Sequence, residues 1–165
     1  MQTDLASLLE RDHDELTFAL KTLHRNEAGI DQLDALDGVR IGFASHVHAE
    51  SSTLRCLLDE HHLPTELRAI ALRINSAHAV QGRALVALLA APLGDTRSRD
   101  RALHLQELIF QHAEHDVRDL DGRLVEYATK QQCQALAERY VKARFLAITL
   151  STPLLSPEGA PQSRV

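Results

Sequence analysis

The chain has 165 residues, of which 44% are hydrophobic and 25% charged, with seven glycines and five prolines. This length suits one domain that buries a core without disulfides, and the scarcity of glycine and proline favours helices over a sandwich or barrel. The formal net charge of -5 argues against nucleic acid or an anionic membrane as a partner, and no apolar run approaches the ~20 residues of a membrane span.

Two further features predict a cytoplasmic location. The first residues are acidic and amphipathic and lack the basic and apolar stretches of a signal peptide. The two cysteines, Cys56 and Cys133, match neither a metal-binding spacing nor a disulfide framework, which suits a reducing compartment.

Apolar residues recur at helical spacing along most of the chain, and few breakers interrupt the pattern. Gly29 stands beyond the first periodic segment, Pro64 ends the second, and a Pro-Leu-Gly-Asp turn at 92–95 ends the third. The second segment begins at Asp31 or Asp34. The five expected helices cover about residues 3–26, 31–60, 65–91, 97–129 and 132–150.

Four long helices with short connections predict an all-α, up-down-up-down four-helix bundle, with residues 1–150 as one domain. Residues 151–165 hold three of the five prolines together with serine, glycine and glutamine, so we expect a flexible tail there. The shorter fifth helix has an apolar stripe with basic residues around it. It is either a lid across the end of the bundle or a contact in a homodimer, and its pattern does not choose between the two.

Four of the ten histidines lie on the apolar stripes of the four long helices, one on each stripe. They are His13, His46, His78 and His112. Glu50 and Asp116 each follow one of these histidines by four residues and therefore leave the same face of the helix. Five others are expected at the surface, at helix ends or in packing positions: His24, His48, His61, His62 and His104.

The six inward side chains also fall at one level of the predicted bundle. His13 and His46 each lie about 16 residues from the turn between their helices, or roughly 24 Å along the axis. Glu50 and His78 each lie about 14 residues from the next turn, or roughly 21 Å. His112 and Asp116 on the fourth helix come within about one helical turn of this level.

Burying four imidazoles and two carboxylates together without an ion would cost several kcal/mol of desolvation. A metal ion binds neutral imidazoles and ionised carboxylates, and mixed nitrogen and oxygen ligands from facing helices are typical of iron or manganese sites. The alternative is that some of the six are core histidines bonded to a neighbouring carboxylate. Their convergence at one level favours a metal site. Candidate carboxylates to orient its imidazoles are Asp12, Glu114 and Asp119.

The order of these residues resembles the hemerythrin-like HHE cation-binding family, with one histidine on the first helix, H-x-x-x-E on the second, one histidine on the third and H-x-x-x-D on the fourth. The Leu-Glu-Arg-Asp-His segment that ends at His13 is similar to the opening helix of that family, and the resemblance covers about residues 3–128. It implies a non-haem centre of two iron ions bridged by Glu50 and Asp116, with zinc or manganese as other candidates.

The chain differs from the oxygen-carrying members of that family on two helices. Those members have two histidines four residues apart on the third helix, whereas Ile74 and Gly82 stand at that spacing from His78 here. On the fourth helix those members have the spacing H-x-x-x-x-D, whereas this chain has H-x-x-x-D. Gly82 predicts an open coordination position for water, oxygen, nitric oxide or peroxide. His115, which pairs with Asp119 at a spacing of four, is a further candidate ligand or a neighbour of one.

The sequence therefore predicts a metal-binding protein that senses oxygen or nitric oxide, or handles iron and oxidants, with a small diatomic ligand or peroxide as its partner. One alternative is an enzyme that reduces peroxide or nitric oxide at the same centre. The other is a non-catalytic helical interaction module with zinc or no metal. A protein that binds a metal or a small gas is favoured over an enzyme.

Overall fold

The computed structural model describes residues 4–25, 32–59 and 63–151, and every regular element in these ranges is a helix. The elements are α1 (Leu5–Arg25), α2 (Gln32–Leu58), α3 (Thr65–Leu89), α4 (Thr96–His112), a π-helix η1 (Ala113–Val117), α5 (Arg118–Tyr127) and α6 (Lys130–Ser151). The all-helical prediction is confirmed. The predicted tail begins at Ser151, which is the last residue of α6, and the rest of it lies outside the described residues. None of the described helices is both long and apolar enough to cross a membrane.

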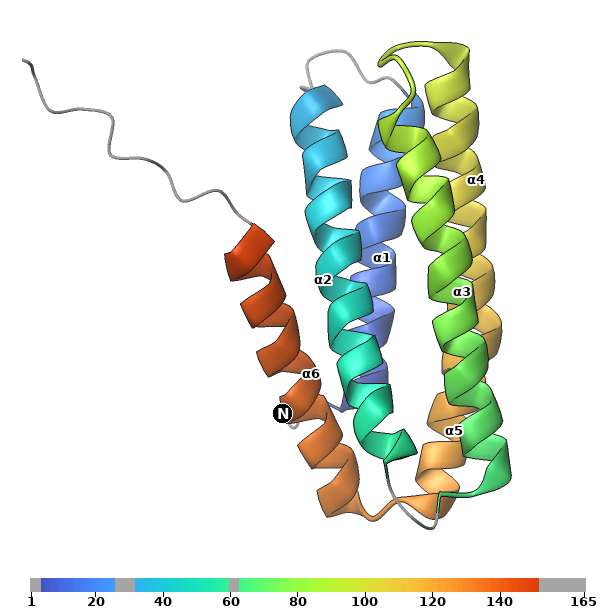
Figure 1. The fold of residues 1–165 in the computed structure, drawn as a ribbon, viewed down its shortest axis with the longest axis vertical. Helices are drawn as coiled ribbons and strands as arrows, with labels where there is room; N and C mark the ends of the chain where they lie inside the picture. Colours follow the sequence, from blue (N-terminus) through green and yellow to red (C-terminus); the bar gives the residue numbers. More distant parts are fainter. Residues whose placement is uncertain (1–3, 26–31, 60–62, 152–165) are drawn as a thin grey trace, which may run out of the picture.

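The long helices lie side by side along the long axis of the molecule (Figure 1). Helices α4, η1 and α5 follow one another as a single rod, so that four rods stand next to each other. The rod of α1 contacts α2 and α4, and α3 also contacts α2 and α4, which closes the arrangement around a shared interior.

Two apolar clusters fill this interior, one toward each end of the rods. The first cluster contains leucines and isoleucines from all four rods, among them Leu8, Leu9, Leu54, Ile70, Ile74 and Leu120. The second is built in the same way and includes Leu16, Leu20, Val39, Phe43, Leu88 and Leu105. Near the middle of the rods, where the two clusters meet, several buried side chains are polar. They include Asp12, His13, His46, Glu50, His78, Gln81 and His112. The core is thus apolar at both ends and polar in the middle.

The expected fourth helix exists as a rod with an irregular turn in its middle. Asp95 caps its beginning, where the side chain accepts a hydrogen bond from the backbone N–H of Arg97. The segment Ala113–Val117 forms the π-helix η1, in which hydrogen bonds span five residues instead of four. No glycine or proline marks this change in the sequence, so the periodicity predicted one continuous α-helix.

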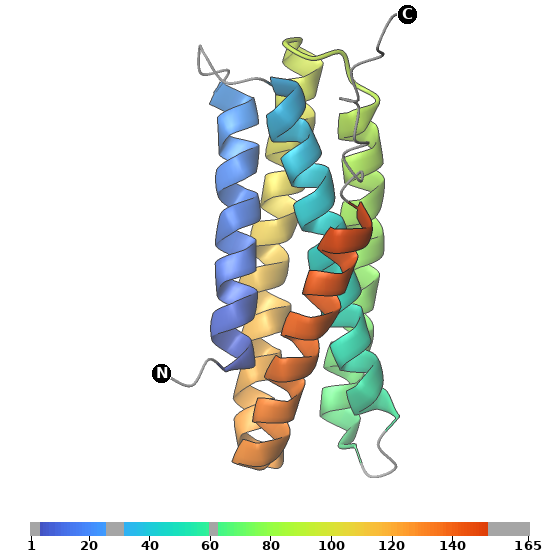
Figure 2. The same cartoon turned by 90° about the vertical axis from the view of Figure 1, so that its left-hand side faces the viewer.

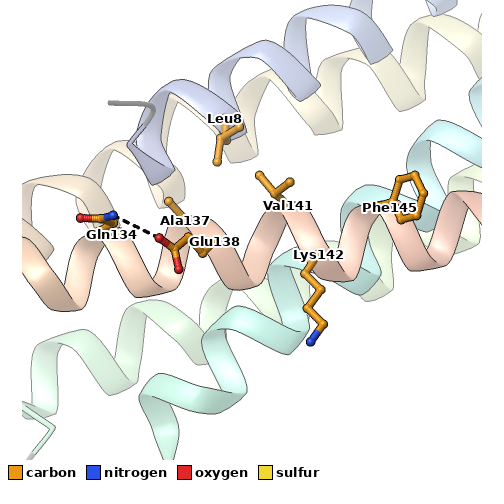
Figure 3. Close-up of a pocket in the computed structure, with 7 residues that line it drawn as sticks. All are labelled: Leu8, Gln134, Ala137, Glu138, Val141, Lys142 and Phe145. Atoms are coloured by element: carbon orange, nitrogen blue, oxygen red, sulfur yellow. Dashed lines mark hydrogen bonds between the residues drawn. The ribbon is translucent and has the colours of Figure 1, made fainter. Parts of the chain in front are cut away.

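Helix α6 lies along the outside of α2 and also contacts α1, rather than across the end of the bundle (Figure 2). Its outer side forms an apolar groove with α1, where Leu8 faces Val141 and Phe145 lies further along the same helix (Figure 3). Val141 is 49% exposed and Phe145 72% exposed. The homodimer contact through this helix stays a prediction.

Substitution of Leu105 by alanine tests the second apolar cluster. Leu105 is 0% exposed, so Leu105→Ala should lower the free energy of unfolding by about 2–5 kcal/mol. Leu103 on the same helix is 40% exposed, and Leu103→Ala should change the free energy of unfolding by less than about 0.5 kcal/mol. Urea unfolding of both variants measures the difference, and equal losses would contradict the assigned core.

Candidate metal centre

Four imidazoles meet in the polar middle of the core, one from each of α1, α2, α3 and α4. Neighbouring ring centroids are 4.5 Å apart for His13 and His46, 5.7 Å for His46 and His78, 5.0 Å for His78 and His112, and 5.2 Å for His112 and His13. All four side chains are buried. They form a closed set, called here the histidine ring, in which each imidazole packs edge-to-face against its two neighbours.

The carboxylate of Glu50 lies against this ring and is 1% exposed. Its Oε2 atom is 3.1 Å from Nε2 of His46 and 3.0 Å from Nε2 of His78. The same oxygen is 3.5 Å from Nε2 of His112. Burial raises the pKa of Glu50, but the three imidazoles lower it by more, so its pKa stays well below the usual value. Glu50 is therefore an anion at neutral pH.

The donor atoms of this cluster are close enough together to hold an ion. His13, His46, Glu50 and His112 each offer one ligand atom, and these four atoms lie within 4.8 Å of one another. Ligands that bind one ion at about 2.0–2.2 Å lie closer together than this limit, so the four side chains would move toward one another on binding. His78 approaches the same carboxylate from α3.

Several of these buried atoms have no hydrogen-bond partner among the described residues. They are both ring nitrogens of His13, Nδ1 of His78 and Oε1 of Glu50. Nε2 of His46 and Nε2 of His112 form no hydrogen bond either, although both face the charged Oε2 of Glu50. Buried polar atoms are almost always paired, and each orphan costs about 1–3 kcal/mol. A metal ion would use these lone pairs, so the chemistry of the donor set fits a metal.

Protons are shared unevenly within the cluster. Burial and the neighbouring His46 lower the pKa of His13 to about 3, and burial also lowers the pKa of His78. Burial opposes the charged form of His46 as well, but Asp12 and Glu50 outweigh it and raise its pKa to about 9. His13 and His78 are therefore already in the neutral form that binds metals, whereas His46 must lose a proton first.

Tyr140 on α6 completes the surroundings of His46. Its hydroxyl donates a hydrogen bond to Oδ2 of Asp12 at 2.6 Å and lies 2.9 Å from Nδ1 of His46. Because the hydroxyl proton points to Asp12, Nδ1–H of His46 donates to the hydroxyl oxygen and Nε2 faces Glu50. Arg144, also on α6, pairs with Asp12 through Nε. The contact fixes the orientation in which His46 would bind a metal.

These supporting residues were predicted only in part. Asp12 was a candidate orienting carboxylate and does lie behind His46. The other two candidates, Asp119 and Glu114, pair instead with arginines, Arg73 at 2.7 Å and Arg118 at 3.0 Å respectively. Tyr140 lies on the apolar stripe of the fifth predicted helix, and that position predicts burial but no polar partner, although a buried tyrosine hydroxyl needs one.

Asp116 lies on the far side of His112 from Glu50. Its Oδ2 is 3.3 Å from Nδ1 of His112, and its Oδ1 accepts a hydrogen bond from Arg73 at 3.1 Å. The cause is η1, whose wider turn makes Val117 the buried residue after His112, where a continuous α-helix would place Asp116. Asp116 therefore stands outside the group of atoms within 4.8 Å, and its role as a ligand stays a prediction.

The remaining histidines of the described ranges are more exposed than the members of the ring. His115 on η1 is exposed, as are His48 and His104, while His24 is partly buried and the pair at 61–62 falls outside the described residues. Gly82 is partly buried, and a Cβ added there would meet no atom within 4 Å. The open coordination position that Gly82 predicts beside the ring stays a prediction.

Comparison with models of known protein families gives no match for this chain. Comparison with curated proteins and with solved structures gives no match either. The resemblance to the hemerythrin-like family rests on the residues of the chain alone.

Tyr140→Phe tests the contact behind His46. The change leaves Asp12 and Nδ1 of His46 without their bridging hydroxyl, which should lower the free energy of unfolding by about 1–3 kcal/mol. It should also weaken metal binding about 10–100-fold, since His46 loses its orienting partner. Tyr127, which is 50% exposed, supplies the control Tyr127→Phe. Urea unfolding and cobalt(II) titration measure both effects, and a variant with unchanged affinity would contradict the orienting role.

The metal-free protein should be most stable near pH 6.5. The folded-state pKa of His13 is lowered to about 3, so below pH 6.5 the unfolded chain binds a proton that the folded chain does not, and stability falls. The folded-state pKa of His46 is raised to about 9, so its contribution is complete below pH 6.5 and is lost as the pH rises toward 9. Chemical unfolding between pH 5 and 9 checks this, and a stability that rises steadily with pH would contradict it.

Proposed function

We propose that this chain is a metal-binding protein of the hemerythrin-like type, an up-down-up-down four-helix bundle with a non-haem iron centre. The proposed role is the sensing of oxygen or nitric oxide, or the handling of iron and oxidants. One observation carries the proposal: four buried imidazoles from four rods gather around one buried carboxylate, and each of them has at least one ring nitrogen without a hydrogen-bond partner among the described residues.

The side-by-side packing of α1, α2, α3 and α4 supports the bundle, and the donor set supports the metal. Nitrogen and oxygen ligands without thiolate suit iron or manganese, with zinc as the competing ion. Both oxygens of Glu50 lie in the polar layer, one near three imidazoles and one without a hydrogen-bond partner, so Glu50 would be a ligand of the centre. Both cysteines are free thiols, which agrees with the proposed cytoplasmic location.

An iron centre would supply reversible redox change and an open position for a small ligand. The protein would hold this centre through its histidine ring and Glu50, and keep it away from bulk water with the apolar clusters on either side. Asp12 and Tyr140 would fix Nδ1–H of His46 and so present Nε2 to the ion. The proton on His46 would leave when the ion binds.

Metal analysis and an optical spectrum of protein purified from iron-replete cells test the proposal. Two irons per chain with an absorption band of an oxo bridge would support it, and zinc or no metal would overturn it. His46→Ala should abolish binding of iron, because it removes a ring member. His48→Ala is the matched control, since His48 lies two residues away on the same helix and is exposed. Equal iron content in both variants would place the metal elsewhere.

A further inference from the structure

A groove of about 440 Å³ runs along the surface between α1 and the rod of α4, η1 and α5. Its α1 side extends from Ala6 to Lys21, and its other side extends from Phe110 to Asp121. His13 lines the groove, whereas the other three members of the histidine ring do not. The groove therefore leads from the surface to one ligand of the candidate centre.

His13 is an unpartnered donor at the bottom of this groove. Its side chain is only 5% exposed, and neither ring nitrogen has a hydrogen-bond partner among the described residues. One ligand atom of His13 also belongs to the four that lie within 4.8 Å of one another. An ion that reached the bottom of the groove would meet His13 first and would then be within reach of the rest of the ring.

The charges around the groove favour a cation. Four carboxylates line it, against two cationic side chains, and one of these, Arg118, is paired with Glu114 at 3.0 Å. Glu10 and Asp14 are exposed and lie three residues before and one residue after His13. Clefts lined by one sign of charge concentrate counter-ions and speed their association.

The proximity of Asp4 to Asp121 adds a further negative charge at one end of the groove. Burial and the nearby carboxylate of Asp4 raise the pKa of Asp121, which lines the groove. Two carboxylates close enough to influence each other make a region that repels anions and attracts divalent cations.

We propose that this groove is the path by which a divalent metal ion reaches the centre from solution, with His13 as the first ligand that the ion meets. The inference rests on the proposed metal centre and adds its route of loading. The carboxylates act at the mouth of the groove by raising the local cation concentration, and they do not bind the ion in the final site.

The experiment measures the rate at which cobalt(II) binds to metal-stripped protein, by stopped-flow absorbance at low ionic strength. The double variant Glu10→Gln, Asp14→Asn should slow association about three- to tenfold, with little change in the dissociation rate. The difference should shrink at high ionic strength, where screening shortens the range of the field. The control Asp34→Asn, Asp37→Asn makes the same change in net charge at exposed positions of α2 outside this groove, and it should load at the wild-type rate.

A blocking variant tests the path without changing a charge. Thr17 is partly buried and lines the groove one turn after His13, so Thr17→Phe should fill it. Association and dissociation of cobalt(II) should both slow several-fold, and the equilibrium affinity should stay the same, because the ligands are untouched.

The outcomes separate the route from the centre itself. The groove would be overturned as the path if cobalt(II) binds the wild-type protein but associates at equal rates with the Glu10→Gln, Asp14→Asn variant and its control. Loading of Thr17→Phe at the wild-type rate would overturn it as well. A wild-type protein that binds no cobalt(II) would instead overturn the metal centre, and the route with it.

Discussion

The buried charge of Glu50 is the constraint on which the rest of the structure depends. A carboxylate that is 1% exposed is unstable in an apolar core unless donors surround it. Nε2 of His78 lies within hydrogen-bond distance of its Oε2 at 3.0 Å, and Nε2 of His46 and of His112 face the same oxygen at 3.1 Å and 3.5 Å. These imidazoles come from three different helices. The level of each helix relative to the others is therefore set by this contact as well as by apolar packing.

The polar layer divides the core and changes how the fold is stabilised. Each apolar cluster draws residues from all four rods, so the two together hold the rods in place above and below the layer. Both ring nitrogens of His13 and Nδ1 of His78 weaken the metal-free fold, because their desolvation is not repaid by hydrogen bonds among the described residues. A bound ion would turn the same atoms into a source of stability, since binding to the folded state alone adds to the free energy of unfolding.

Helical periodicity predicted the part of the site that depends on local geometry. The spacing of 3.6 residues per turn placed His13, His46, His78 and His112 on inward faces, and the structure brings their rings together. Tyr140 could not be assigned in this way, because it is 128 residues from Asp12 in the chain and no local pattern reports such a pairing. Its position on an apolar stripe indicated burial but not the partner of its hydroxyl.

The π-helix η1 explains why the prediction for Asp116 differs from its observed position. Its five residues contain no breaker, and the wider turn rotates everything that follows relative to a regular α-helix. Val117 is buried as a result, while Asp116 turns to Nδ1 of His112 and to Arg73. The same turn supplies Ala113 and Val117 to the wall of the groove beside His13. One local irregularity thus sets both the partner behind His112 and the shape of the groove that leads to the ring.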